Sequence, residues 1–158
     1  DRRRKAGTRV ALHPVRKATL SIPFIRSEIE ASGKSYGYHL LSQQTEPAPA
    51  PVTLKFALAN NAQLLHVVAL HEADGDPFVI EDRWINSSVI PHLADVSFAE
   101  LSANEWLLQN APFTHGDIDF GAKNASQREA ELLATKPDKA LFVISRTTWD
   151  QTKAVTMV

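Results

Sequence analysis

The sequence predicts an α+β fold in which short helices pack on an antiparallel β-sheet. Three patterns support this class: a glycine-containing reversal between two β-prone runs, two serine-capped helix starts, and two β-prone runs at the end of the chain. Hairpins interleaved with short helices are typical of antiparallel sheets. The chain has 158 residues, which is enough for one compact domain with its own hydrophobic core.

The strongest local signal lies in the middle of the chain. Two β-prone runs, residues 64–72 and 78–85, are joined by Ala73-Asp-Gly-Asp76. Glycine accepts the positive φ that a tight reversal requires, and Pro77 stands at the first position of its strand, where a missing N–H does least harm. We therefore expect a β-hairpin here.

The N-terminal half predicts one helix, one strand and one ambiguous segment. Residues 24–33 have helical spacing, with Gly33 as a left-handed C-terminal cap. Residues 36–44 are expected to form a strand, which a stiff connector containing Pro47, Pro49 and Pro51 follows. Residues 52–59 fit either an alternating strand or a short helix with Pro51 in its first turn, and we prefer the helix.

The C-terminal half predicts two helices and a strand pair. Ser102-Ala-Asn-Glu105 and Ser126-Gln-Arg-Glu129 both match the capping box, in which serine and glutamate satisfy opposite backbone donors. Residues 141–149 form a clear β-prone run, and Asp150-Gln-Thr-Lys153 turns it into a final strand over residues 154–158.

Composition and motifs exclude several classes of function. The net charge of −1 provides no overall field for attracting a polyanion, so this segment alone is not expected to bind nucleic acid. The absence of cysteine excludes disulfides and thiolate chemistry, and no apolar run approaches the ~20 residues that cross a bilayer. We expect a cytoplasmic protein without a membrane partner.

Neither a metal site nor a catalytic site is predicted. His66 and His71 are five residues apart on one strand, so they point to opposite faces, and the other histidines are scattered. The chain has no nucleophile elbow, no H-E-x-x-H motif and no glycine-rich phosphate loop. We therefore expect no metal, no cofactor and no catalytic residue.

Charged residues within the second strand of the hairpin are the most informative feature. Glu81 and Arg83 share one strand face with apolar residues, and burying charge is costly unless the charge is paired or meets a ligand. The alternative is an ion pair on a solvated sheet face. A two-residue loop would place both residues on the face of His66. A three-residue loop with a glycine bulge would place them with His71, so that all three could converge on one small pocket. We prefer this register, partly because of the resemblance described below.

Several segments together resemble a known family. Residues 65–86, Asn104-Glu-Trp-Leu107 and Ser145-Arg-Thr-Thr-Trp149 are similar to the effector-binding UTRA domain of GntR-type transcription regulators, in particular to the branch that controls histidine utilisation. The resemblance covers about residues 20–158 and implies a fold like that of chorismate lyase. Gly7-Thr-Arg-Val10 resembles the end of the family's winged-helix domain. We therefore expect residues 1–14 to be a remnant of an upstream DNA-binding domain and its linker, and residues 15–158 to be the effector domain.

The resemblance implies a sensor rather than an enzyme. In this branch the inducer is urocanate, and the regulator is a dimer that releases operator DNA, which it binds through the N-terminal domain. Sugar-sensing relatives use a set of residues whose positions here hold Ala69, His71, Glu81, Asn104 and Thr156. Only the glutamate is kept, and the loss of two arginines weakens a phosphosugar interpretation.

Urocanate chemistry then defines the candidate site. Its carboxylate requires a cation or several N–H donors; Arg83 or Arg146 can offer a bidentate fork, and His71 is a candidate for a further hydrogen bond. Its imidazole requires a donor and an acceptor, which Glu81, Asn104 or Thr156 can supply, and Trp106 is a candidate for stacking on the ring. The structural alternatives are core packing for Trp106, an ion pair for Arg146 and strand propensity for Thr156. The alternative functions are a chorismate-lyase-like enzyme and a sensor of another metabolite, such as an amino-sugar phosphate.

Overall fold

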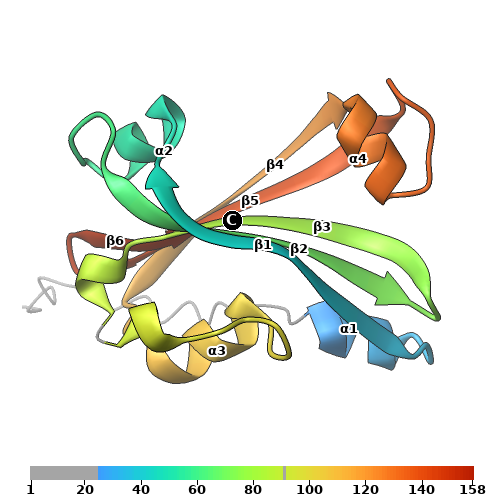
Figure 1. Cartoon of the computed structure of the whole chain (residues 1–158), viewed down its shortest axis with the longest axis horizontal. Coiled ribbons are helices and arrows are strands. Elements are labelled where there is room, and N and C mark those ends of the chain that lie inside the picture. The colour runs from blue at the N-terminus through green and yellow to red at the C-terminus, as the bar shows by residue number, and fades with distance from the viewer. Residues whose placement is uncertain (1–24, 91) are drawn as a thin grey trace, which may run out of the picture.

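A computed structural model describes residues 25–90 and 92–158. The expected DNA-binding remnant at residues 1–14 lies outside the described residues, as does Phe24. Six antiparallel strands form one sheet in the order β1-β2-β3-β6-β5-β4, which confirms the predicted fold class (Figure 1). The strands are β1 (Tyr36–Pro47), β2 (Gln63–Ala73), β3 (Asp76–Ile85), β4 (His115–Asn124), β5 (Ala140–Asp150) and β6 (Lys153–Met157). The helices are α1 (Ile25–Ala31), α2 (Ala50–Lys55), α3 (Ala103–Asn110) and α4 (Gln127–Leu132).

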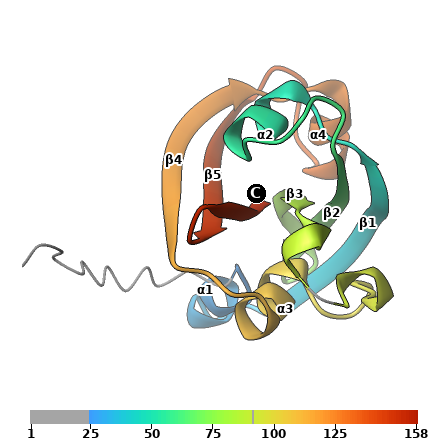
Figure 2. The same cartoon turned by 90° about the vertical axis from the view of Figure 1, so that its left-hand side faces the viewer.

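The sheet consists of two halves that meet along a short seam. Strands β3 and β6 pair only through Trp84 with Met157 and Ile85 with Thr156. Beyond this seam β3 and β5 diverge (Figure 1). Helices α1 and α3 lie on one side of the curved sheet, and α2 and α4 lie on the other (Figures 1 and 2). The seam and α3 together frame the region where the candidate site residues lie.

The main hydrophobic core fills the space between the sheet and α3. It is centred on Ile85 and Phe98, both 0% exposed, and continues into the segment between β3 and α3. Burial of a side chain of this kind contributes about 1.5–3 kcal/mol. A second cluster lies under α2 on the opposite face, where Val52 and Phe56 pack on Leu64 and Ala154.

The N-terminal elements follow the predictions closely. Helix α1 ends before Gly33, whose φ of +81° is the expected left-handed conformation. The ambiguous segment is the preferred short helix, α2, with Pro51 in its first turn. It ends four residues earlier than predicted because Ala57 turns the backbone to a φ of +53°. Strand β1 extends three residues beyond the predicted end.

The two capping boxes differ in the structure. At α4 both halves of the box form between Ser126 and Glu129. At α3 Ser102 accepts from the backbone N–H of Glu105, as predicted, but the carboxylate of Glu105 binds the Ser102 hydroxyl and Arg26 instead of the Ser102 backbone. A guanidinium partner from α1 therefore replaces the second half of this box.

Strand β4 has no counterpart in the sequence predictions. It pairs with β5 along its whole length and forms an edge of the sheet. Gly116, Gly121 and several charged residues interrupt its apolar alternation, so its pattern is weak.

The β2–β3 hairpin reaches the preferred register by a different route. The loop has two residues, Asp74 and Gly75, with φ of +56° and +83°, so the predicted three-residue loop is wrong. A bulge at Phe78 supplies the extra residue: Glu72 pairs with Pro77, whereas His71 pairs with Val79. Because one extra residue reverses the facing of every later side chain, Glu81 and Arg83 point to the face of His71.

Gly75 gives a direct test of this turn. We expect Gly75→Ala to lower the free energy of unfolding by about 1–2 kcal/mol, since a Cβ there meets no atom within 4 Å and the cost is the left-handed backbone alone. Urea denaturation measures the change. Gly121→Ala is the matched control, because it also meets nothing within 4 Å and has no positive φ, and it should be neutral or slightly stabilising. Equal losses in both variants would contradict this account.

Candidate functional site

A buried cluster of charged side chains occupies the inner face of β2 and β3. His71, Glu81 and Arg83 are 1%, 3% and 2% exposed. The Nε of Arg83 donates to Oε1 of Glu81 at 2.6 Å, and Nε2 of His71 lies 3.1 Å from Oε2 of the same carboxylate. Because an ionised carboxylate only accepts, His71 donates through Nε2, and its Nδ1 lies 2.8 Å from the Tyr36 hydroxyl. The expected convergence of these three residues is present.

The other half of the cluster comes from α3, β5 and β6. Arg83 donates to Oδ1 of Asn104 at 3.1 Å and to the Thr156 hydroxyl at 3.3 Å. Arg146 donates to the same Asn104 oxygen at 2.6 Å. Thr156 in turn donates to the backbone carbonyl of Trp84. Two guanidinium groups therefore share one amide oxygen at the seam of the sheet.

The two arginines of the cluster differ in their counter-charges: Arg83 is paired with Glu81, whereas Arg146 bonds a neutral amide. Burial acts to raise the pKa of Glu81, but the charge of Arg83 and hydrogen bonds from His71 and Arg83 outweigh it and lower that pKa to about 2. Burial, together with repulsion from Arg83, lowers the pKa of Arg146 to about 10. Among the described residues no carboxylate lies within ion-pair distance of Arg146. The cluster therefore carries excess positive charge beside Asn104.

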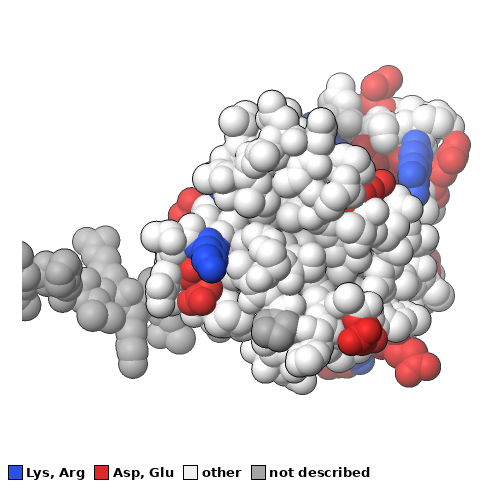
Figure 3. Space-filling model, turned by 60° about the vertical axis from the view of Figure 1, so that its left-hand side comes forward, with Lys and Arg blue, Asp and Glu red and all other residues white. Residues whose placement is uncertain are grey.

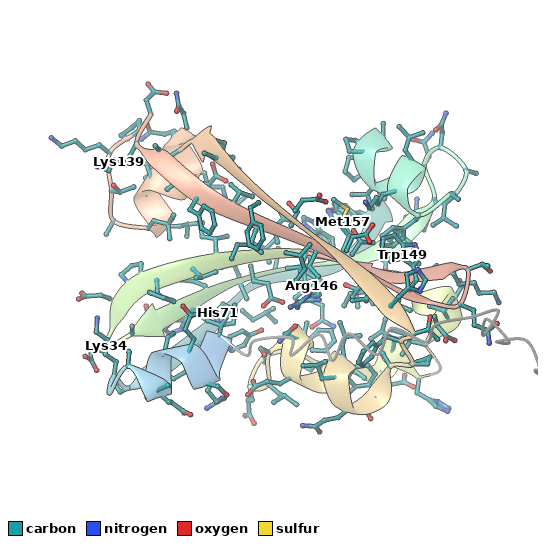
Figure 4. All side chains as sticks on the ribbon, turned by 180° about the vertical axis from the view of Figure 1, so that it is seen from behind. Lys34, His71, Lys139, Arg146, Trp149 and Met157 are labelled. Carbon is teal, nitrogen blue, oxygen red and sulfur yellow. The ribbon has the colours of Figure 1, made fainter. Side chains whose placement is uncertain are left out.

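A small pocket with a cavity volume of about 20 Å³, partly open to solvent, adjoins the Asn104 end of this cluster. Four of the predicted site residues line it: Arg83, Asn104, Arg146 and Thr156. The other lining residues are Leu107, Leu108, Ala111, Pro112, Phe113, Thr148 and Val155. Figure 4 shows Arg146 near the middle of the sheet, on the side of α3, and His71 farther toward α1. The pocket thus combines cationic and hydroxyl groups with an apolar wall.

The remaining three candidates do not line this pocket. His71 and Glu81 lie behind Arg83, where each of their bonding groups is engaged. Glu81 bonds Arg83 directly, and His71 bonds Glu81. Trp106 packs edge-to-face on Phe98, with ring centroids 6.0 Å apart, and belongs to the border of the core. This placement agrees with the structural alternative for Trp106 and gives a stacking role no support.

Sequence reasoning missed several residues of the site. Thr148 was detectable, since it shares the strand face of Arg146, whereas Phe113 lies in a connection with no periodic pattern. Tyr36 was missed because its contact with His71 depends on the β1–β2 register. Long-range pairing of this kind cannot be predicted from local sequence patterns.

His66 belongs to a separate surface cluster on the opposite face of the sheet. It lies between the carboxylates of Glu46, at 2.6 Å, and Asp82, at 2.9 Å, and stacks on Trp84. Each ring nitrogen faces a different carboxylate, so the arrangement does not converge on one ion. Within residues 25–90 and 92–158 no group of three or more histidine and acidic side chains is placed to hold a metal.

The surface charge and the helix lengths give no sign of a basic patch on the face shown in Figure 3 or of a membrane-spanning helix among the described residues. On the face shown in Figure 3 the Lys and Arg side chains are scattered instead of gathered into a basic patch. In the part of the chain that the structure describes, no helix has the length and apolar character needed to cross a membrane.

Glu81 should be the most sensitive residue of the cluster. We expect Glu81→Gln to lower the free energy of unfolding by about 3–5 kcal/mol, because it leaves the buried guanidinium of Arg83 without a counter-charge. Chemical denaturation checks the value. Asp82→Asn is the matched control on the same strand; its side chain is 63% exposed, so its loss should stay below about 1 kcal/mol. Similar losses for the two variants would argue against a buried ion pair.

The pH dependence of stability provides a second test of Glu81. Since its pKa is lowered from 4.5 to about 2 on folding, its contribution is complete above pH 4.5 and is lost as the pH falls toward 2. Urea unfolding between pH 7 and 3 should show a steeper acid loss for the wild type than for Glu81→Gln. Glu129 has a similarly lowered pKa, so the difference between the two proteins isolates Glu81. Parallel curves would contradict the assignment.

Comparison with known proteins identifies the family of this domain. A family model described as the UTRA domain matches residues 31–158. The chain is 28% identical over 150 residues to the histidine utilization repressor of Pseudomonas putida, in an alignment that covers 95% of this chain and 60% of that protein.

Solved structures of related regulators have the same fold. The C-terminal domain of the histidine utilization repressor from Pseudomonas syringae pv. tomato superimposes with a TM-score of 0.72 at 25% identity, covering 78% of this chain and 87% of that one. The effector domain of PhnF from Mycobacterium smegmatis shares the fold, with a TM-score of 0.74 at 20% identity over 87% of this chain and 86% of that one. These relatives are regulators and effector domains, which supports a sensor over an enzyme. The resemblance seen in the sequence motifs is therefore confirmed, and the chain belongs to the UTRA domain family.

Proposed function

We propose that this domain is the effector sensor of a histidine-utilisation type GntR repressor, and that it binds urocanate or a similar small carboxylate. The observation that carries the proposal is the pair of guanidinium groups, Arg83 and Arg146, that share Asn104 beside an open pocket. Arg83 has Glu81 as its counter-charge, whereas Arg146 bonds a neutral amide. An anionic ligand group is the natural complement of this excess charge.

The lining of the pocket suits a carboxylate with an apolar or aromatic body. The fork of Arg146 can receive the carboxylate in a bidentate way, with Arg83 beside it. The hydroxyl groups of Thr148 and Thr156 can bond the polar atoms of an imidazole. Leu107 and Phe113 offer apolar surface to the plane of the ring. We assign His71 and Glu81 the role of holding Arg83 in place.

The chain spans 60% of the length of the Pseudomonas putida repressor that it matches, so the activity of the whole regulator is part of the proposal. We infer a cytoplasmic homodimer that binds operator DNA through an N-terminal winged-helix domain, with residues 1–14 as the end of that module and residues 15–158 as the effector domain. Binding of the effector would favour one arrangement of the DNA-binding domains over another.

Urocanate binding provides the direct test. At a urocanate concentration one hundred times its Kd, the domain should gain about 2.7 kcal/mol of stability, which thermal denaturation detects as a higher Tm. Arg146→Gln should weaken the affinity at least about tenfold in calorimetric titration, because a charge-assisted bond contributes about 1.5–3 kcal/mol. Arg128→Gln, on the exposed surface of α4, is the matched control and should leave the affinity unchanged.

Other ligands separate the alternatives. An amino-sugar phosphate that raises the Tm where urocanate does not would overturn the urocanate assignment and keep the sensor class. Urocanate binding that is equally strong in Arg146→Gln would place the ligand outside the pocket described here.

A further inference from the structure

Arg26 on α1 is the meeting point of two chains of contacts that start at Arg83. The first runs through α3. Arg83 donates to Asn104, and the next residue in the first turn of that helix is Glu105. Oε1 of Glu105 accepts from Nε of Arg26 at 2.7 Å. The first turn of α3 therefore contacts the pocket through Asn104 and α1 through Glu105.

The second chain of contacts runs through β1, β2 and β3. Arg83 bonds Glu81, which bonds His71, whose Nδ1 lies 2.8 Å from the hydroxyl of Tyr36. The guanidinium carbon of Arg26 lies 4.3 Å from the centroid of the Tyr36 ring. Figure 4 agrees with this order, because His71 lies between Arg146 and α1. Both chains thus end on one side chain.

The contact between Arg26 and Glu105 is partly buried, since the Arg26 side chain is 38% exposed. The Glu105 side chain is only 13% exposed, and its second oxygen accepts from the Ser102 hydroxyl, so its position is well determined. The hydrogen bond to Glu105 raises the pKa of Arg26 above its ordinary value. By contrast, Glu30 lies 3.9 Å from Arg26 and is 54% exposed, so it competes weakly.

We propose that Arg26 couples the effector pocket to α1, the first described helix of the domain, through Glu105 and Tyr36. An anion that takes N–H groups of Arg83 and Arg146 competes with the Asn104 oxygen that now accepts from both. Release of Asn104 loosens the first turn of α3, and with it the hold of Glu105 on Arg26. The identity of the anion rests on the proposed function, but the chain of contacts does not require it.

The position of α1 in the chain gives this coupling its direction. Residues 1–24 precede α1 in the sequence, on the side where the proposed DNA-binding domain would be attached. A change in how firmly α1 is held on the sheet would therefore act on the side of the domain where that module is proposed to be attached. Allosteric coupling requires a contact with two states whose equilibrium the ligand biases, and the pair of Arg26 and Glu105 is the contact that we propose for this role.

Hydrogen exchange of the α1 backbone amides tests the coupling without any ligand. We expect Asn104→Ser to speed exchange in α1 by at least about fivefold relative to the core amides of β2, which correct for any loss of global stability. In an Arg26→Ala background the same substitution should change α1 exchange less than about twofold. Arg128→Ala is the matched control background and should leave the Asn104→Ser effect intact.

A second variant keeps the coupling testable if Asn104→Ser fails to fold. Tyr36→Phe keeps the ring next to Arg26 and removes only the hydroxyl that contacts His71. It should speed α1 exchange in the wild-type background and not in Arg26→Ala. Equal effects of either substitution in both backgrounds would overturn the coupling, as would an α1 that responds to neither.

Saturating urocanate completes the experiment. Faster α1 exchange in the wild type, lost in Arg26→Ala while the Kd stays within about threefold, supports the coupling. Urocanate that binds and leaves α1 exchange unchanged overturns it. If urocanate fails to bind while the Asn104 and Arg26 substitutions are coupled, the proposed effector is wrong and the link between the pocket and α1 stands.

Discussion

The buried guanidinium of Arg83 is the constraint on which the rest of the site depends. A guanidinium carries five N–H donors and a permanent charge, and its transfer from water to the protein interior costs several kcal/mol unless partners surround it. Here the partners are a carboxylate, an amide oxygen and a hydroxyl, supplied by Glu81, Asn104 and Thr156. Every buried side-chain polar atom in the described part of the chain has a partner, so this requirement is met throughout.

Meeting that requirement also joins the two halves of the sheet. Strands β3 and β6 share only two residue pairs, yet Arg83 on β3 reaches Thr156 on β6 and Asn104 on α3. The polar cluster therefore spans the seam where backbone pairing is shortest. Any change in the charge of the pocket acts at this seam, because the same side chains bind across it and line the open space beside it.

The separation of roles within the cluster has a simple physical basis. Glu81 and His71 are fully occupied with their protein partners, and we propose that they support Arg83. The side chain of Arg146 bonds a neutral acceptor and borders the pocket, which is why we propose that its charge receives the ligand. A sensor needs both properties: a fixed frame that preserves the geometry and one cation whose interactions can be exchanged.

Local sequence determined which segments form helices and strands wherever the pattern was strong: the Asp74-Gly75 reversal, the Ser126 capping box, the Gly33 cap and the apolar runs of β2, β3 and β5. It also identified Glu81 and Arg83 as charges out of place in an apolar strand. It failed for β4, whose glycines and charges dilute the alternation, and for the hairpin loop, where a bulge at Phe78 did what a longer loop was expected to do.

Only the tertiary structure decided which of the candidates face the pocket, which hold Arg83 and which, like Trp106, belong to the core. Those assignments depend on the pairing of segments that lie 35 to 79 residues apart, as with Tyr36 and His71 or Arg26 and Glu105. Periodicity records which face of an element is buried. It does not record what the buried face meets, because that is set by packing and strand register over the whole domain.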